Sequence, residues 1–213
     1  MNQDLKKKIF YRVVELHTQT GKPVGSKILT RRYFKTISPA SMRCYLSELV
    51  DEGLLQNVNI STGRIPTDKG WRQYVRDMQE QQGGHSALKR KLSEDTMFKI
   101  LLPEMHSTVI VRGGAHERTE GLFDTLLSPE FEDRESLIDF LQFFEDVKKS
   151  LDKIAKNFSE DESHVFIGDE NPINSKYSMM IMKKGDALCA IIGPKRMDYP
   201  KNIQFMQHIN ELL

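Results

Sequence analysis

The sequence predicts an α+β protein of two parts, and three observations carry that prediction. The first 80 residues show apolar residues at helical spacing, followed by a short hairpin pattern. The later residues combine one long amphipathic helical pattern with strand-like segments. Between them, residues 79–86 (QEQQGGHS) offer no apolar side chain to bury. We therefore expect a domain over 1–80, a linker and connecting helix over 81–106, and a second domain over 107–213.

Composition excludes several protein classes. Of the 213 residues, 38% are hydrophobic and 29% are charged, as in water-soluble proteins. No apolar run approaches the roughly 20 residues of a membrane helix, and the first ten residues lack a signal-peptide core. Cys44 and Cys189 lie far apart, in neither disulfide-framework nor zinc-ligand spacing. We expect a cytoplasmic protein without a membrane segment, metal or cofactor.

The net charge of +1 hides an asymmetry between the two parts. Residues 1–80 contain 14 basic and 8 acidic residues, for a net charge of +6. Residues 81–213 contain 17 basic and 22 acidic residues, for a net charge of −5. A basic part joined to an acidic part favours a polyanion-binding module attached to a domain with another role.

The basic part reads as three helices and a hairpin. We expect helices over 5–20, 27–34 and 39–52. Gly21 ends the first, Ser26 is the expected N-cap of the second, and Ser38 with Pro39 forms an N-cap and first-turn pair for the third. A strand over 54–60, a turn over 61–64 and a returning strand from 65 predict a wing tipped by Gly63 and Arg64. A last helix follows over 67–78.

The third helix has the pattern of a recognition helix in a helix-turn-helix. Met42, Leu46 and Leu49 share its inner face. Its outer face is small and polar, with a basic residue near the N-terminus, and comprises Ala40, Arg43, Cys44 and Ser47. The acidic residues come only in the last turns, so the N-terminal end can approach phosphates.

These patterns predict which residues contact DNA. Arg43 can bond a guanine edge with two hydrogen bonds, or it can pair only with phosphate or with the nearby Ser47 or Glu48. Ser38 and Ser41 can donate to DNA, although an N-cap role alone also explains Ser38. Arg64 is expected in the minor groove or at the backbone. The predicted DNA-binding set is Lys27, Arg31, Arg32, Ser38, Ala40, Ser41, Arg43, Cys44, Ser47, Thr62, Gly63 and Arg64, with Lys35 as a further phosphate candidate.

The acidic part predicts a small antiparallel sheet with helices on one face. Asp133 can cap a helix over 134–157, whose apolar stripe fills a core or a partner's groove, and Phe140, Phe144 and Val147 are candidate interface residues. Strands are expected over 163–167, 177–182 and 187–192. The sequence contains no metal-binding histidine pair, nucleophile motif or phosphate loop, so we expect no enzyme.

Several motifs together resemble the HrcA family of bacterial heat-shock repressors. In the basic part they are residues 23–27 (PVGSK), 38–43 (SPASMR), 49–54 (LVDEGL), 63–72 (GRIPTDKGWR) and 74–75 (YV). In the acidic part they are 129–131 with 133, 167–168 with 170–171, and 193–199 (GPKRMDY). The resemblance therefore touches both ends of the chain.

The chain departs from the family pattern at three places. Cys44 stands where family members usually have asparagine, and residues 58–60 (VNI) replace the usual Pro-His-Thr. Relatives also carry the first part of a GAF-like domain and a dimerisation insert between the positions of Leu88 and Ser107, where this chain is short. The resemblance thus implies a winged helix followed by a reduced GAF-like domain with little interior for a ligand.

The resemblance also implies a function. Family members repress chaperone genes by binding the CIRCE inverted repeat in double-stranded DNA as dimers, assisted by the GroEL chaperonin. We therefore expect a homodimeric repressor. The alternative is a DNA-binding interaction module of low specificity that acts through a protein partner of its acidic part.

Overall fold

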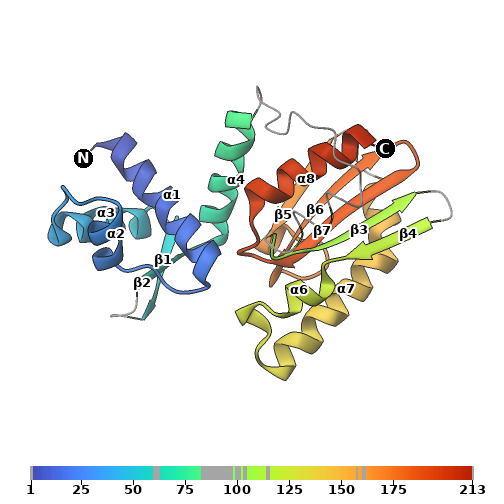
Figure 1. The fold of residues 1–213 in the computed structure, drawn as a ribbon, viewed down its shortest axis with the longest axis horizontal. Coiled ribbons are helices and arrows are strands. Elements are labelled where there is room, and N and C mark those ends of the chain that lie inside the picture. The colour runs from blue at the N-terminus through green and yellow to red at the C-terminus, as the bar shows by residue number, and fades with distance from the viewer. Residues whose placement is uncertain are drawn as a thin grey trace. The chain divides into compact units, whose positions relative to one another are not determined.

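The computed structural model describes residues 2–59, 63–82, 98, 102, 105–113, 116–156, 158–159 and 162–212. It forms two compact units, Met1–Gln81 and Gln82–Leu213 (Figure 1). Each unit combines helices with an antiparallel sheet, which confirms the predicted α+β class. The connecting helix expected over 81–106 falls mostly outside the described residues.

The N-terminal unit begins with three helices. They are α1 (Gln3–Thr20), α2 (Ser26–Arg32) and α3 (Pro39–Asp51). The side chain of Asn2 accepts a hydrogen bond from the Leu5 amide at the start of α1, and Gly21 ends this helix in the left-handed conformation. Local sequence signals therefore set both ends of α1.

One predicted cap of this unit was wrong. Ser26 is the first residue of α2 rather than its N-cap, and the preceding Gly25 caps the helix without a side-chain bond. Val24 is held in a backbone bridge to Arg64. This bridge keeps the chain extended up to Gly25, so the helix begins directly after it.

A two-stranded hairpin and a fourth helix complete the unit. Strand β1 (Leu55–Asn59) pairs with β2 (Gly63–Pro66) in an antiparallel manner, and α4 (Asp68–Gln82) follows. The Thr67 hydroxyl accepts a hydrogen bond from the Gly70 amide at 3.0 Å, so Thr67 caps α4 as expected. The helix continues past its predicted end at residue 78.

The core of the N-terminal unit lies where its helices meet. Met42, Leu46 and Leu49 of α3 are almost completely buried, as the helical pattern predicts. Trp71 and Tyr74 of α4 are also buried, which makes them core residues rather than platforms for base stacking. The opposite face of α3 is consequently free to serve as a surface.

The C-terminal unit is built on a five-stranded antiparallel sheet in the order β4-β3-β7-β6-β5. Its elements are β3 (Thr108–Gly113), β4 (His116–Glu120), α6 (Leu122–Leu126), η2 (Pro129–Phe131), α7 (Arg134–Ala155), β5 (Ser163–Ile167), η3 (Gly168–Glu170), β6 (Tyr177–Lys184), β7 (Ala187–Pro194) and α8 (Tyr199–Leu212). The three expected strands and the helix capped by Asp133 are confirmed.

Two expectations about this sheet were wrong. It has five strands rather than three, and helices cover both faces, with α7 on one and α8 on the other (Figure 1). Strands β6 and β7 are apolar at successive positions, so each buries side chains on both faces. Helix α8 was missed because it buries polar residues such as Asn202, whose amide oxygen accepts from the Ser107 hydroxyl at 2.7 Å.

Helix α7 fills the core on its side of the sheet. Phe140, Phe144 and Val147 are buried there against residues such as Ile181 and Ala190. They are therefore core residues, as the sequence favoured for most of this stripe, and of the two alternatives the interface between chains is excluded for these three. The apolar stripe of α7 packs against the sheet face beneath it, so these side chains are buried within the unit.

The turn at residues 193–196 has a structural role. Arg196 is 4% exposed and forms an ion pair with Glu130. The Tyr199 hydroxyl donates to the Lys195 carbonyl oxygen at 2.9 Å and contacts the Ser178 hydroxyl at 2.8 Å.

In the part of the chain that the structure describes, no helix is long and apolar enough to cross a membrane.

Candidate nucleic-acid interface

The N-terminus of α3 is organised by two serines. The Ser38 side chain accepts a hydrogen bond from the Ser41 amide at 3.0 Å, and the two hydroxyl oxygens lie 2.9 Å apart. Pro39 occupies the first turn, where no amide hydrogen is needed. Ser38 thus acts as the helix cap. Both serines remain exposed beside the positive end of the helix dipole.

The outer face of α3 is accessible along most of its length. Ala40, Ser41, Arg43, Cys44 and Ser47 are all exposed. These side chains are short except for Arg43, so a groove of a duplex could approach the helix closely. The structure therefore places the five predicted residues of this helix together on one surface.

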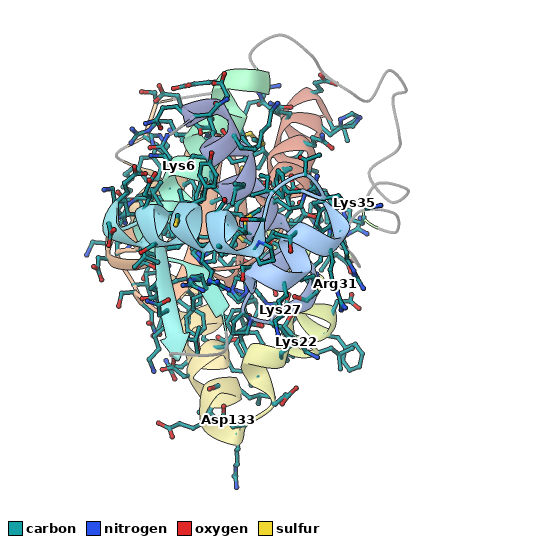
Figure 2. All side chains as sticks on the ribbon, turned by 90° about the vertical axis from the view of Figure 1, so that its left-hand side faces the viewer. Lys6, Lys22, Lys27, Arg31, Lys35 and Asp133 are labelled. Carbon is teal, nitrogen blue, oxygen red and sulfur yellow. The ribbon has the colours of Figure 1, made fainter. Side chains whose placement is uncertain are left out.

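Six exposed cations lie on α2, on α3 and in the loops that flank α2, and no ion pair holds any of them among the described residues. They are Lys22, Lys27, Arg31, Arg32, Lys35 and Arg43. Figure 2 shows Lys22, Lys27, Arg31 and Lys35 together and well apart from Lys6. Together, these six residues are named the α2–α3 basic surface.

Three cations of α1 are held in ion pairs. Lys6 forms ion pairs with Glu52 and, at 3.7 Å, with Glu48. Lys7 pairs with Asp77 at 3.1 Å. Arg12 pairs with Glu15 at 2.8 Å, and its guanidinium also stacks on Tyr33 at 4.4 Å from the ring centroid. These carboxylates lie on α1, α4 and the last turns of α3, and α2 with its flanking loops contains no Asp or Glu.

Lys22 is the one member of this surface that the sequence patterns did not single out. A simple signal could have found it, because residues 16–47 contain six cations and no Asp or Glu. The rest of residues 1–80 holds eight basic and eight acidic residues. The whole net charge of the unit therefore resides in that one stretch.

The hairpin differs from the expected wing in one respect. Gly63 faces Asn59 and Arg64 faces Asn57 within the strand ladder, so neither lies at the tip. Arg64 also exchanges backbone hydrogen bonds with Val24, at 2.9 and 3.0 Å. The turn itself, including the predicted contact residue Thr62, lies outside the described residues.

The Arg64 side chain is half-buried, and its Nε atom has no hydrogen-bond partner in the structure. A buried guanidinium nitrogen without an acceptor costs free energy unless an acceptor arrives. Because this Nε atom is closed to solvent, a ligand oxygen such as that of a phosphate reaches it only when the side chain turns outward.

A polar network joins α1 to α4. Asp77 is buried and accepts hydrogen bonds from Tyr11 and, at 2.9 Å, from Gln73. Burial acts to raise the pKa of the Asp77 carboxyl, but the hydrogen bonds from Tyr11, Lys7 and Gln73 outweigh it and lower the pKa below its ordinary value of 3.8.

This network predicts a pH dependence. Because the folded-state pKa of Asp77 is lowered, its stabilising contribution is present above the ordinary value of 3.8 and is lost as the pH falls below it. We expect Asp77→Asn to reduce the free energy of unfolding by about 1–3 kcal/mol at pH 7. The loss should shrink toward pH 3. Urea denaturation of the two proteins at several pH values measures it.

The exposed Asp51 provides the matched control, because no ion pair holds its carboxylate among the described residues. Asp51→Asn should change the free energy of unfolding by less than about 0.5 kcal/mol at either pH. Equal effects of the two variants would contradict the role assigned to the Asp77 network.

The described residues contain no group of three or more His, Cys, Asp or Glu side chains that could hold a metal ion. Burial raises the pKa of the Cys189 thiol to about 12, so this cysteine is unreactive. Cys44 is exposed on α3 and is a free thiol.

Comparison with known proteins is consistent with this geometry. Residues 72–203 match the family model described as the HrcA protein C terminal domain. The chain is 32% identical over 131 residues to the heat-inducible transcription repressor HrcA of Symbiobacterium thermophilum, covering 55% of this chain and 38% of that protein. It is 43% identical over 70 residues to the protein of the same name from Moorella thermoacetica, covering 33% and 20%.

The fold as a whole also has a counterpart. A crystal structure of a hypothetical protein at 2.2 Å resolution superimposes with a TM-score of 0.76 at 14% sequence identity, covering 100% of this chain and 98% of the other. The matches to the two repressors span well under half the length of those proteins. Because the family model covers more than half of the present sequence, the chain belongs to the HrcA family.

Proposed function

We propose that this protein is a transcriptional repressor of heat-shock genes that binds an inverted-repeat operator of the CIRCE type as a dimer. The observation that carries the proposal is the α2–α3 basic surface. It sets six unpaired cations beside an exposed helix face of small polar residues. The name of the HrcA relatives, heat-inducible transcription repressor, supports the same function.

In this proposal the N-terminal unit is a winged helix-turn-helix. Helix α3 enters the major groove with its N-terminal half, where Arg43 meets a base edge. Lys27, Arg31 and Arg32 of α2 bind phosphates beside the groove. The β1–β2 hairpin is the wing. Arg64 lies near its base, where its guanidinium binds a phosphate oxygen once the side chain turns outward and its unpartnered Nε gains an acceptor.

In the same proposal the C-terminal unit is GAF-like and pairs two chains. A two-fold dimer matches the symmetry of an inverted repeat. We also propose that the GroEL chaperonin restores the active fold after heating. Operator affinity that survives a heat step without chaperonin would contradict this last part alone.

Binding to an operator tests the proposal directly. Fluorescence anisotropy compares a CIRCE-type inverted repeat with a scrambled duplex of equal length over a salt series. We expect a preference of roughly 10³ or more for the operator at physiological salt. Affinity for both duplexes should fall with salt, by about 0.9 in log K per log salt for each phosphate contact. Equal affinities with equal salt slopes would refute sequence-specific repression.

A second candidate is the interaction module of low specificity. Phe123 and Leu127 favour it, because they are 73% and 69% exposed and lie one helical turn apart. Exposed apolar side chains of this size often mark protein contacts. The operator preference separates the two candidates, since a module of this kind binds the scrambled duplex equally well.

A further inference from the structure

One edge strand of the C-terminal sheet lacks the charged residues and prolines that usually prevent a further strand from pairing. Strand β5 ends the sheet and pairs on its inner side with β6, from Ser163 opposite Met182 to Ile167 opposite Ser178. Within the described part of the chain, no strand pairs with its outer side. The strand (SHVFI) contains no proline and no Asp, Glu, Lys or Arg. Such an edge presents free backbone groups to an added strand.

The opposite edge is protected. Strand β4 has the sequence HERTE, and its charged side chains are tied into ion pairs. Glu117 pairs with Lys148 at 2.8 Å and also with Arg112, while Arg118 pairs with Glu120 at 3.1 Å. Charged side chains on an edge strand oppose the addition of a further strand. Of the two edge strands, only β5 is therefore suited to pair with a further strand.

A groove of about 390 Å³ lies beside β5 on the α7 face of the sheet, with Ser150 and Lys153 as its polar lining residues. Ile154 of α7, Phe158, Phe166 of β5 and Ile173 line it, and all four are half-buried. The Phe158 ring stacks on His164 with centroids 4.0 Å apart. Apolar and aromatic surface thus adjoins the free edge directly.

We propose that β5 pairs with β5 of a second copy, antiparallel and centred on Val165. A two-fold axis through that point sets Ser163 opposite Ile167 and His164 opposite Phe166 of the other chain. Residues opposite each other point to the same face. Both α7 helices then lie on the same side of a ten-stranded sheet, and each groove faces the other.

The edges themselves argue for a second copy as the occupant. When β5 of one chain pairs with β5 of the other, no open edge remains, and the charged strand β4 forms both outer edges of the joined sheet. No third chain can then add a strand, so the assembly stops at a dimer. Glu162 and Asp169 flank β5 and are exposed, which limits pairing to the five strand residues. The choice of a second copy also rests on the proposed function, because an inverted repeat needs two chains and Phe140, Phe144 and Val147 are buried.

The interface is small. Strand and groove together supply about 11 residues from each copy, against the 20 to 30 of a standard interface, so we expect a dissociation constant in the micromolar range. In the antiparallel pair, Glu162 of one copy approaches Asp169 of the other, so like charges meet at both ends of β5. Raising the salt concentration should therefore strengthen the dimer, whereas it weakens DNA binding.

Sedimentation of the full chain at 1–200 µM without DNA tests the proposal. We expect a monomer–dimer equilibrium in which His164→Glu raises the dissociation constant at least tenfold, because it sets a charge opposite Phe166 of the other copy. His116→Glu makes the same change on the guarded edge and should leave the constant unaltered. Circular dichroism and thermal melting verify that both variants fold.

A cross-link gives an independent measurement. Residues facing each other in an antiparallel pair have Cα atoms about 4.5–5.5 Å apart, within reach of a disulfide. Val165→Cys in a Cys44→Ser background should form a covalent dimer on oxidation, whereas His116→Cys in that background should not. A monomer at 200 µM, equal effects of the two His→Glu variants, or equal cross-linking would each overturn the proposal.

These assays separate the interface from the repressor function. Dimerisation without operator preference would refute the repressor and leave the interface standing. Operator preference in a protein that does not use β5 would refute the interface alone.

Discussion

Replacing Arg43 with alanine is expected to lower affinity for the inverted-repeat operator by about 5- to 150-fold for each half-site, corresponding to about 1–3 kcal/mol each. Arg43 is the one long side chain on the exposed outer face of α3, and no ion pair holds it among the described residues. An arginine in this position can bond the O6 and N7 atoms of one guanine. Affinity for a scrambled duplex should fall much less, since only the phosphate contact is lost there.

Lys27→Ala is the matched control for this prediction. Lys27 belongs to the same surface but lies on α2, where it can reach only phosphates in the proposed geometry. Its loss should weaken binding to operator and scrambled duplex equally and reduce the salt slope by about 0.9 for each bound chain. Anisotropy titrations of both variants on both duplexes make the comparison. If Arg43→Ala also weakens the two duplexes equally, Arg43 is a phosphate contact and specificity lies elsewhere.

The second large effect concerns Gly63, which joins the hairpin to the rest of the N-terminal unit. Its φ of +117° is strained for any residue with a side chain. A Cβ atom there would lie 2.8–3.0 Å from the backbone C, O and N of Val24. We expect Gly63→Ala to reduce the free energy of unfolding by about 3 kcal/mol, because strain and overpacking add. DNA binding should weaken as well, since Arg64 follows directly in the strand.

Trp71 allows this loss to be measured in the correct unit. It is the single tryptophan of the chain and is buried in the N-terminal core, so its fluorescence during urea denaturation reports on that unit. Gly25→Ala is the control, since a Cβ atom at Gly25 meets nothing within 4 Å, and its effect should stay below about 1 kcal/mol. Wild-type stability of Gly63→Ala would show that the hairpin does not dock against Val24.

Most helices and strands could be predicted from the sequence, because the interactions that begin them lie within a few residues of the chain. Ser38 with Pro39 begins α3, and Asp133 begins α7 by accepting a hydrogen bond from the Ser136 amide at 2.8 Å. Helical spacing likewise separated the inner face of α3 from its outer face. The same locality explains why the surface residues of α3 could be named from the sequence.

The errors concern contacts between distant segments. Arg64 was assigned to the tip of a wing, yet its bridge to Val24 places it inside a ladder. The strands β3 and β4 escaped notice because β4 is charged, and β3 finds its place only by pairing Ile110 with Ala190 of β7. Periodicity within a segment carries no information about its partner.

The family, most helices with their caps, the basic character of the first 80 residues and the outer face of α3 all follow from the amino-acid sequence. Which cations stay unpaired, which apolar stripe is core and which sheet edge is open follow instead from the folded structure. Caps and amphipathic spacing act within a few residues of chain, and the sequence therefore shows them directly. Burial, ion pairing and edge exposure instead depend on what packs against each segment, and those neighbours come from distant parts of the chain.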